Sequence, residues 1–162
     1  MNEIKTMKKN SKKGFTLVEL VVVIAILAIL AAIAIPVVSS TITSSQRSSA
    51  LSNAQPLELG LKEAHAQIIA GDTSAGFSST SKISEVITAK SLQAVEQEVN
   101  INNVDYVLCW HAANDKVLYV TGTESGGIAA SPKCLDDSVT VAAADVAILD
   151  IDSTTATVMD LF

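Results

Sequence analysis

Residues 14–36 read GFTLVELVVVIAILAILAAIAIP, and Glu19 is the only ionisable side chain among them. The sixteen residues at 20–35 carry no polar atom in any side chain. As a helix, such a run with its apolar flanks is long enough to cross the roughly 30 Å hydrocarbon core of a bilayer. Pro36 has no N–H to donate, so we expect a kink at that point. The run therefore predicts a single membrane helix.

The charge of the chain is distributed unevenly around this run. Five lysines against Glu3 give residues 1–14 a formal charge of +4, so the remainder carries −10 to give the whole chain its net −6. A basic start beside an apolar run fits a segment held on the cytoplasmic side of a membrane, with the rest translocated. The acidic remainder argues against direct nucleic-acid binding through phosphate contacts. No second run approaches the roughly 18 apolar residues of another span, which excludes a multi-span transporter or channel.

An amphipathic helix follows the apolar run. Its apolar side chains recur at spacings of three and four residues, which is the period of one helix face. They are Ala50, Ala54, Leu57, Leu61, Ala64 and Ile68. The intervening residues 39–49 are rich in Ser and Thr but contain no Gly or Pro. The pattern predicts one long helix over residues 15–70, bent again near Pro56 and stopped at Gly71.

The period changes in the remainder of the chain. After a loop at 71–81, we expect a short helix that Ser81 or Ser84 caps. Segments rich in β-branched and aromatic residues then predict strands. These segments are 99–101, 104–110 and 117–121, with further candidates at 139–141, 146–151 and 156–159. Only this sheet can bury the apolar face of the long helix. The sequence therefore predicts an α+β fold, in which a long N-terminal helix packs on a small antiparallel β-sheet.

The segment KKGFTLVEL at residues 12–20 carries most of the functional information. A carboxylate inside an apolar span is costly and tends to mark a functional residue, which singles out Glu19. Glu19 lies four residues after Phe15, and Pro36 lies 21 after it. With the Gly14-Phe15 junction, this arrangement resembles the class III signal of type IV pilins and the related pseudopilins. The resemblance is strong over residues 12–36.

This resemblance implies processing and assembly. A prepilin peptidase would cut between Gly14 and Phe15 and methylate the new amino group of Phe15. Glu19 of one subunit would then pair with the Phe15 ammonium of a neighbour and select the register of a helical homopolymer. Pro36 would seed an unwound stretch in the filament, unless it is only a tolerated kink. The chain would be a structural subunit of a type IV pilus, namely a major pilin. It would not be an enzyme.

Four regions and a set of partners follow from the same resemblance. Residues 1–14 form the basic leader, 15–38 the transmembrane and filament-core half of the helix, 39–70 its amphipathic half, and 71–162 the globular head. The precursor would lie in the cytoplasmic (inner) membrane as a single-pass protein, and the mature subunit in an extracellular pilus. Its partners would be further copies of itself, the prepilin peptidase and the pilus assembly machinery.

Two alternatives stay open. A pseudopilin of a type II secretion or competence system shares the same N-terminal segment. The second alternative is a different class of protein, a binding domain that uses the apolar run only for export. Such a domain is either membrane-anchored or released. Ala32-Ile33-Ala34 has the small-residue pattern of ordinary signal peptidase sites, so cleavage would leave a soluble protein beginning at Ile35. That alternative explains neither Gly14-Phe15 nor Glu19.

Two cysteines, Cys109 and Cys134, are separated by 24 residues. In an exported domain such a pair is expected to form a disulfide. The pair also resembles the disulfide that encloses a variable loop near the C-terminus of type IV pilins, although 28 residues follow Cys134 here. Two buried free thiols are the alternative.

Catalytic chemistry finds no support in the remaining residues. The chain contains no nucleophile elbow, phosphate-binding loop or His-Glu-x-x-His motif, and the sequence predicts no catalytic residue, cofactor or metal site. His65 is expected to be partly buried at the edge of the helix stripe, and His111 to lie on the surface at a strand end. Aspartates near the C-terminus are interpreted as solvated surface charge. They are Asp136, Asp137, Asp145, Asp150 and Asp152.

Overall fold

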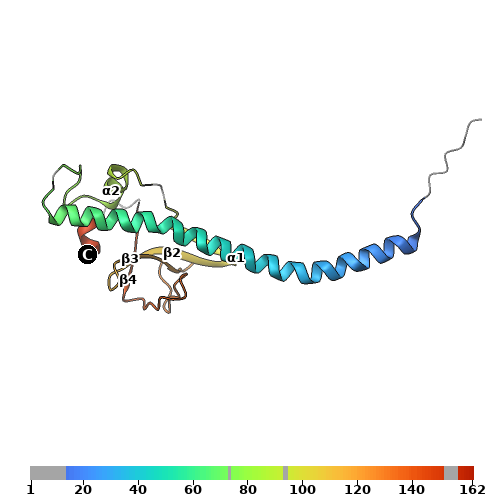
Figure 1. Cartoon of the computed structure of the whole chain (residues 1–162). Helices are drawn as coiled ribbons and strands as arrows, with labels where there is room; N and C mark the ends of the chain where they lie inside the picture. The colour runs from blue at the N-terminus through green and yellow to red at the C-terminus, as the bar shows by residue number, and fades with distance from the viewer. Residues whose placement is uncertain (1–13, 73, 93–94, 152–156) are drawn as a thin grey trace, which may run out of the picture. The chain divides into compact units, whose positions relative to one another are not determined.

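The structure, a computed structural model, describes residues 14–72, 74–92, 95–151 and 157–162. These residues form two α-helices, four strands and a short 3₁₀ helix (Figure 1). They are α1 (Leu17–Ile69), α2 (Ile83–Ala89), β1 (Glu98–Ile101), β2 (Val104–His111), β3 (Lys116–Thr121), β4 (Val146–Ile148) and η1 (Val158–Leu161). The predicted α+β fold, with a long N-terminal helix and a small antiparallel sheet, is confirmed.

Helix α1 comprises 53 residues and continues through both of its prolines. At its end, the Gly71 N–H donates to the Ile68 carbonyl and the Asp72 N–H donates to the Gln67 carbonyl, each at 3.0 Å. Gly71 has a φ of +72°, a left-handed conformation that glycine adopts without steric cost. These features make up a Schellman motif, so the predicted stop is confirmed. The bends expected at the two prolines stay predictions.

Contacts within the chain divide it inside α1, between Thr41 and Ile42. No side chain is buried in the described residues before Ala50. The second unit, residues 42–162, holds the rest of α1 and all of the sheet. Among the residues that the structure describes, a packed core therefore exists only in this second unit, which we call the head.

The sheet is antiparallel and centres on β2. Strand β3 pairs with one edge of β2 over residues 106–111. On the other edge, β1 pairs with residues 104–107 and β4 with residues 109–111. Asn102 and Asn103 connect β1 to β2 with φ angles of +53° and +63°. Two positive φ angles match a two-residue turn to the twist of the strands, and asparagine tolerates them. The predicted β1-β2-β3 meander is confirmed.

The apolar stripe of α1 packs on one face of this sheet. Leu57 and Leu61 are fully buried in a cluster that includes Trp110 of β2. The opposite face is covered as well, because Cys109 belongs to a second cluster formed with side chains from 128–146. Over residues 107–111, strand β2 is thus buried on both faces, which is why this part of its sequence is mostly apolar.

Two strand predictions are wrong. Residues 139–141 form no strand, although Val141 is buried. They cover the second cluster with their side chains, and the apolar alternation of this segment reflects that packing rather than a ladder. Of the segment at 156–159, residue 156 lies outside the described residues and Val158 begins η1 instead of a strand. Strand β4 also ends earlier than predicted, at Ile148.

The predicted cap of α2 is also wrong. The N-terminal cap is Lys82, whose N–H donates to the Glu85 carboxylate at 3.1 Å. Ser81 is buried instead, where its hydroxyl accepts from the Ser78 N–H at 3.0 Å and its carbonyl accepts from the Val158 N–H. Ser81 therefore holds a loop and η1 together rather than the helix start.

Candidate functional site: the first turns of α1

The Gly14-Phe15 peptide bond lies just before α1, outside any regular hydrogen-bonded element. The Phe15 side chain is 90% exposed. A Cβ atom added at Gly14 would meet no other atom within 4 Å. The bond predicted to be cut is therefore carried by open, non-helical backbone, the form in which a protease can bind a substrate strand.

Thr16 and Glu19 cap the start of α1 reciprocally. The Thr16 N–H and hydroxyl both donate to Glu19 Oε2 at 3.0 Å. In return the Glu19 N–H donates to Thr16 Oγ1 at 3.2 Å. This is a capping box, which satisfies two backbone donors that a helix start otherwise leaves free. Sequence reasoning missed it, although the Thr-x-x-Glu spacing before an apolar run is its signature.

The apolar half of α1 is exposed along its whole length. Every described residue from Gly14 to Ile42 is exposed, including all of its large apolar side chains. Within the part of the chain that the structure describes, α1 is the one helix long and apolar enough to cross a membrane, by length and composition alone. Soluble monomers rarely expose an apolar surface of this extent, and such surfaces mark contacts with membranes or partners.

Two side-chain hydroxyls form hydrogen bonds to the backbone just after Pro36. The Ser40 and Thr41 hydroxyls both donate to the Val37 carbonyl, each at 2.9 Å. Hydroxyl bonds of this kind compete with the backbone bonds of a helix and often bend it. Proline has already removed one backbone donor a turn earlier. The helix is therefore less strongly held over residues 36–41 than over its uniformly apolar part.

Cys109 and Cys134 are buried free thiols in this structure, and both belong to the second apolar cluster. Burial, and secondly the neighbouring Cys134, raises the pKa of Cys109 to about 12. Burial also raises the pKa of Cys134.

The backbone register explains why the two thiols are separate. Cys109 pairs with Leu118 on one edge of β3, and Cys134 pairs with Val120 on the other edge. Two strand spacings amount to roughly 9 Å or more, beyond the roughly 7 Å between Cα atoms that a disulfide can bridge without backbone movement. The disulfide stays a prediction, and it would require residues around Cys134 to leave their place beside β3.

The other candidate residues lie in the head. His65 is half-buried, as predicted, and stacks on Phe162 with ring centroids 4.1 Å apart. The surface position predicted for His111 is wrong, since its exposure is 5%. Lys116 of β3 and Val146 of β4 flank it on both sides, so the end of β2 is covered.

Metal-ligating groups are not gathered anywhere in the described part of the chain. No group of three or more His, Cys, Asp or Glu side chains there is placed to hold a metal ion. Asp137, Asp145 and Asp150 are exposed, as expected of surface charge, and Asp136 is half-buried. Asp152 lies outside the described residues.

Together, the fold and the N-terminal segment define a protein with one long helix. The second half of this helix belongs to an α+β head, and its first half is apolar enough to lie in a membrane. Residues 9–35 match the family model of the prokaryotic N-terminal methylation motif. This motif is the class III signal of type IV pilins. No curated protein and no solved structure matches the chain at a significant level.

Proposed function

We propose that this chain is the precursor of a structural subunit, a major pilin, of a type IV pilus. The observation that carries the proposal is the methylation motif at residues 9–35, matched on a segment whose geometry suits the motif's chemistry. Gly14 and Phe15 lie in open backbone before α1. A prepilin peptidase would cut between them and methylate the new amino group of Phe15. The motif suggests a structural subunit rather than an enzyme.

The four regions of the chain take different parts in this function. Residues 1–14 act as the leader, and 15–38 anchor the precursor in the cytoplasmic (inner) membrane before forming the filament core. Residues 39–70, the amphipathic half of α1, join this anchor to the globular region at 71–162. In the precursor, lipid covers the apolar surface of residues 15–38. Once this segment leaves the membrane, the same segment of other subunits would have to cover that surface instead. Extraction from the membrane and self-assembly therefore belong to one process, which the pilus assembly machinery drives.

Glu19 has a part in each state of this process. In the precursor its carboxylate accepts from Thr16 of its own chain, which helps to offset the cost of a charge in an apolar span. In the filament, we propose, the carboxylate pairs with the Phe15 ammonium of a neighbouring subunit. A buried charge is tolerable when it is paired, so only the register that brings the two groups together is favoured. Pro36, with the hydroxyls that follow it, would seed the unwound stretch of the helix.

The experiment that tests the function is intact-mass analysis, with N-terminal fragmentation, of protein sheared from the cell surface. Cells with and without the prepilin peptidase are compared. We expect a chain of 148 residues beginning at N-methylated Phe15, found in the sheared fraction only when the peptidase is present. A chain beginning at Ile35, or an uncut chain confined to the membrane, would reject the proposal.

A matched pair of variants sharpens this test. A Gly14→Val side chain meets no atom within 4 Å at its Cβ, so it should leave the fold intact while blocking the prepilin peptidase. Ala34→Leu removes the small residue that ordinary signal peptidase requires. We expect Gly14→Val to abolish processing and Ala34→Leu to leave it unchanged. The reverse pattern would favour the exported binding domain.

The pseudopilin alternative predicts the same cleavage but a different product. Electron microscopy of the sheared fraction separates the two, because a pilus subunit forms long surface fibres. A correctly processed chain that never appears in such fibres at its native expression level would favour the pseudopilin.

A further inference from the structure

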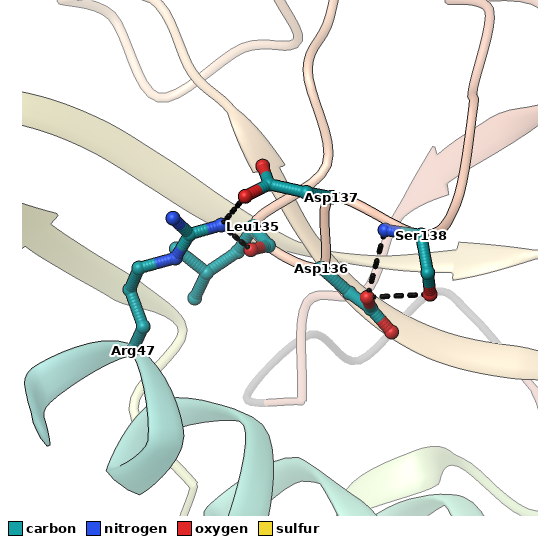
Figure 2. A network of polar contacts seen from close by, with 5 residues as sticks. All are labelled: Arg47, Leu135, Asp136, Asp137 and Ser138. Atoms are coloured by element: carbon teal, nitrogen blue, oxygen red, sulfur yellow. Dashed lines mark hydrogen bonds and ion pairs between the residues drawn. The ribbon is translucent and has the colours of Figure 1, made fainter. Parts of the chain in front are cut away.

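Arg47 connects α1 to a loop far along the chain. Its Nη2 atom donates to the Leu135 carbonyl at 2.6 Å and pairs with Asp137 Oδ2 at the same distance (Figure 2). The Arg47 side chain is 34% exposed, whereas the Asp137 side chain is 80% exposed. Because exposed ion pairs contribute little, the half-buried bond to the carbonyl is the stronger part of this contact. We call the contact of Arg47 with Leu135 and Asp137 the Arg47 clasp.

The loop that contains Leu135 and Asp137 is itself hydrogen-bonded, both to β3 and within its own turn. Leu135 is 1% exposed, and its N–H donates to the Tyr119 carbonyl of β3 at 2.7 Å. Asp136 accepts from the Ser138 N–H at 3.0 Å and from its hydroxyl at 2.6 Å (Figure 2). These two bonds lower the pKa of Asp136, because they stabilise its ionised form. Because Leu135 is itself hydrogen-bonded to β3, the bond from Arg47 to Leu135 connects α1 to the sheet through this loop.

Arg47 also stands where the surroundings of α1 change. Described residues before it contain no buried side chain, and Ala50, three residues later, is the first. The preceding segment contains Pro36 and the hydroxyls that bond to the Val37 carbonyl, two features that loosen a helix. None of residues 36–46 is buried, whereas the residues after Arg47 include the core residues Ala50 and Ala54.

We propose that Arg47 is the positioning residue that ends the deformable part of α1. Unwinding or lengthening that starts near Pro36 would spread toward the head until it reached the Arg47 clasp. From there on, the helix would keep its place on the sheet. The clasp does not depend on whether the chain forms a pilus or a pseudopilus, because all of its groups belong to one head.

Hydrogen exchange of backbone amides in the full chain, solubilised in detergent micelles, tests the proposal. Arg47→Met keeps an apolar stem but removes the charge and the donors. Asp137→Asn removes only the ion pair and leaves the bond to Leu135. Ser48→Ala is the matched control, since Ser48 is exposed on the next position of the same helix.

In Arg47→Met we expect exchange to speed up about tenfold over residues 43–54 and 133–139, because a hydrogen bond from a charged group shifts local opening by about that factor. Asp137→Asn should have a smaller effect confined to the same residues, and Ser48→Ala none. Strands β2 and β3 should exchange as in the parent chain.

Two results would overturn the proposal. Unchanged exchange in Arg47→Met would mean that the Arg47 clasp does not restrain the backbone of α1 or of the loop. An equal rise across β2 and β3 would mean that Arg47 only stabilises the head as a whole. Because the measurement uses unassembled protein, a failure here is distinguishable from a failure of the proposed filament function.

Discussion

Tyr119 offers a quantitative test of the head, because its hydroxyl is buried. The side chain is 0% exposed, and its hydroxyl donates to the Glu96 carbonyl. Burial, and secondly the charge of Glu96, raises the pKa of Tyr119 from 10.0 to about 12. Between these two values the unfolded chain loses the phenol proton while the folded chain keeps it. The stability contributed by the neutral phenol is thus complete below pH 10 and is lost as the pH rises toward 12.

The size of this loss follows from the shift. A shift of two pKa units corresponds to about 2.7 kcal/mol of unfolding free energy in total, of which about 1.4 kcal/mol is lost by pH 11. Tyr119→Phe should be less stable than the parent chain at pH 8, by about 1–2 kcal/mol, because the Glu96 carbonyl loses its donor. Above pH 10 the variant should lose less stability than the parent, and the two curves should converge.

Urea unfolding of the full chain in micelles at pH 8, 10 and 11 measures both effects. Trp110 is the only tryptophan and is 2% exposed, so its fluorescence reports the opening of the head. All ionisable groups other than Tyr119 are common to both chains, so their contributions cancel in the difference. If the stability gap between the parent and Tyr119→Phe stays constant from pH 8 to pH 11, the reasoning about the buried phenol is refuted.

Three further predictions concern assembly, packing and the thiols. Glu19→Ala should still be cleaved and methylated but should yield few or no sheared filaments; normal yields would contradict the role of the carboxylate in register. Gly60→Ala places a Cβ 2.5 Å from Leu92 Cδ1, so the half-buried Leu92 side chain must shift. This cost offsets the gain of about 1 kcal/mol that alanine brings to a helix interior, so in urea unfolding we expect Gly60→Ala to be more favourable in a Leu92→Ala background than in the parent chain. Cys109 and Cys134 should both react with an alkylating reagent only after unfolding, and a non-reduced mass lower by two hydrogens would instead establish the disulfide.

Much of the fold could be predicted from local pattern. The three-and-four spacing of apolar residues in α1 follows from burying one face against the sheet, and the core contains that face. The end of the helix was readable from Gly71, because few other residues adopt a positive φ at low cost. The turn at Asn102 and Asn103 was readable for a similar reason. Each of these features depends only on residues close together in the chain.

Features set by distant residues were harder to predict. His111 lies at a strand end, which suggests exposure, but β3 and β4 cover it from both sides. The spacing of Cys109 and Cys134 permits a disulfide, whereas the register of β3 places a whole strand between them. Arg47 and Leu135 are 88 positions apart. No local pattern indicates which carbonyl a guanidinium will reach, because that depends on how the sheet is closed.

The first turn of α1 would join the membrane role and the proposed assembly role of Glu19 in one group of atoms. A helix start in an apolar medium leaves backbone N–H groups without water, and each such donor is costly there. The Glu19 carboxylate accepts from the Thr16 N–H and hydroxyl, so the same charge that is expensive in lipid also satisfies the helix start. A carboxylate has acceptor sites beyond these two bonds. In the proposed filament, Glu19 would therefore keep its own cap and still receive the Phe15 ammonium of another chain. Under that proposal, transfer from lipid to filament adds one partner to the carboxylate and removes none.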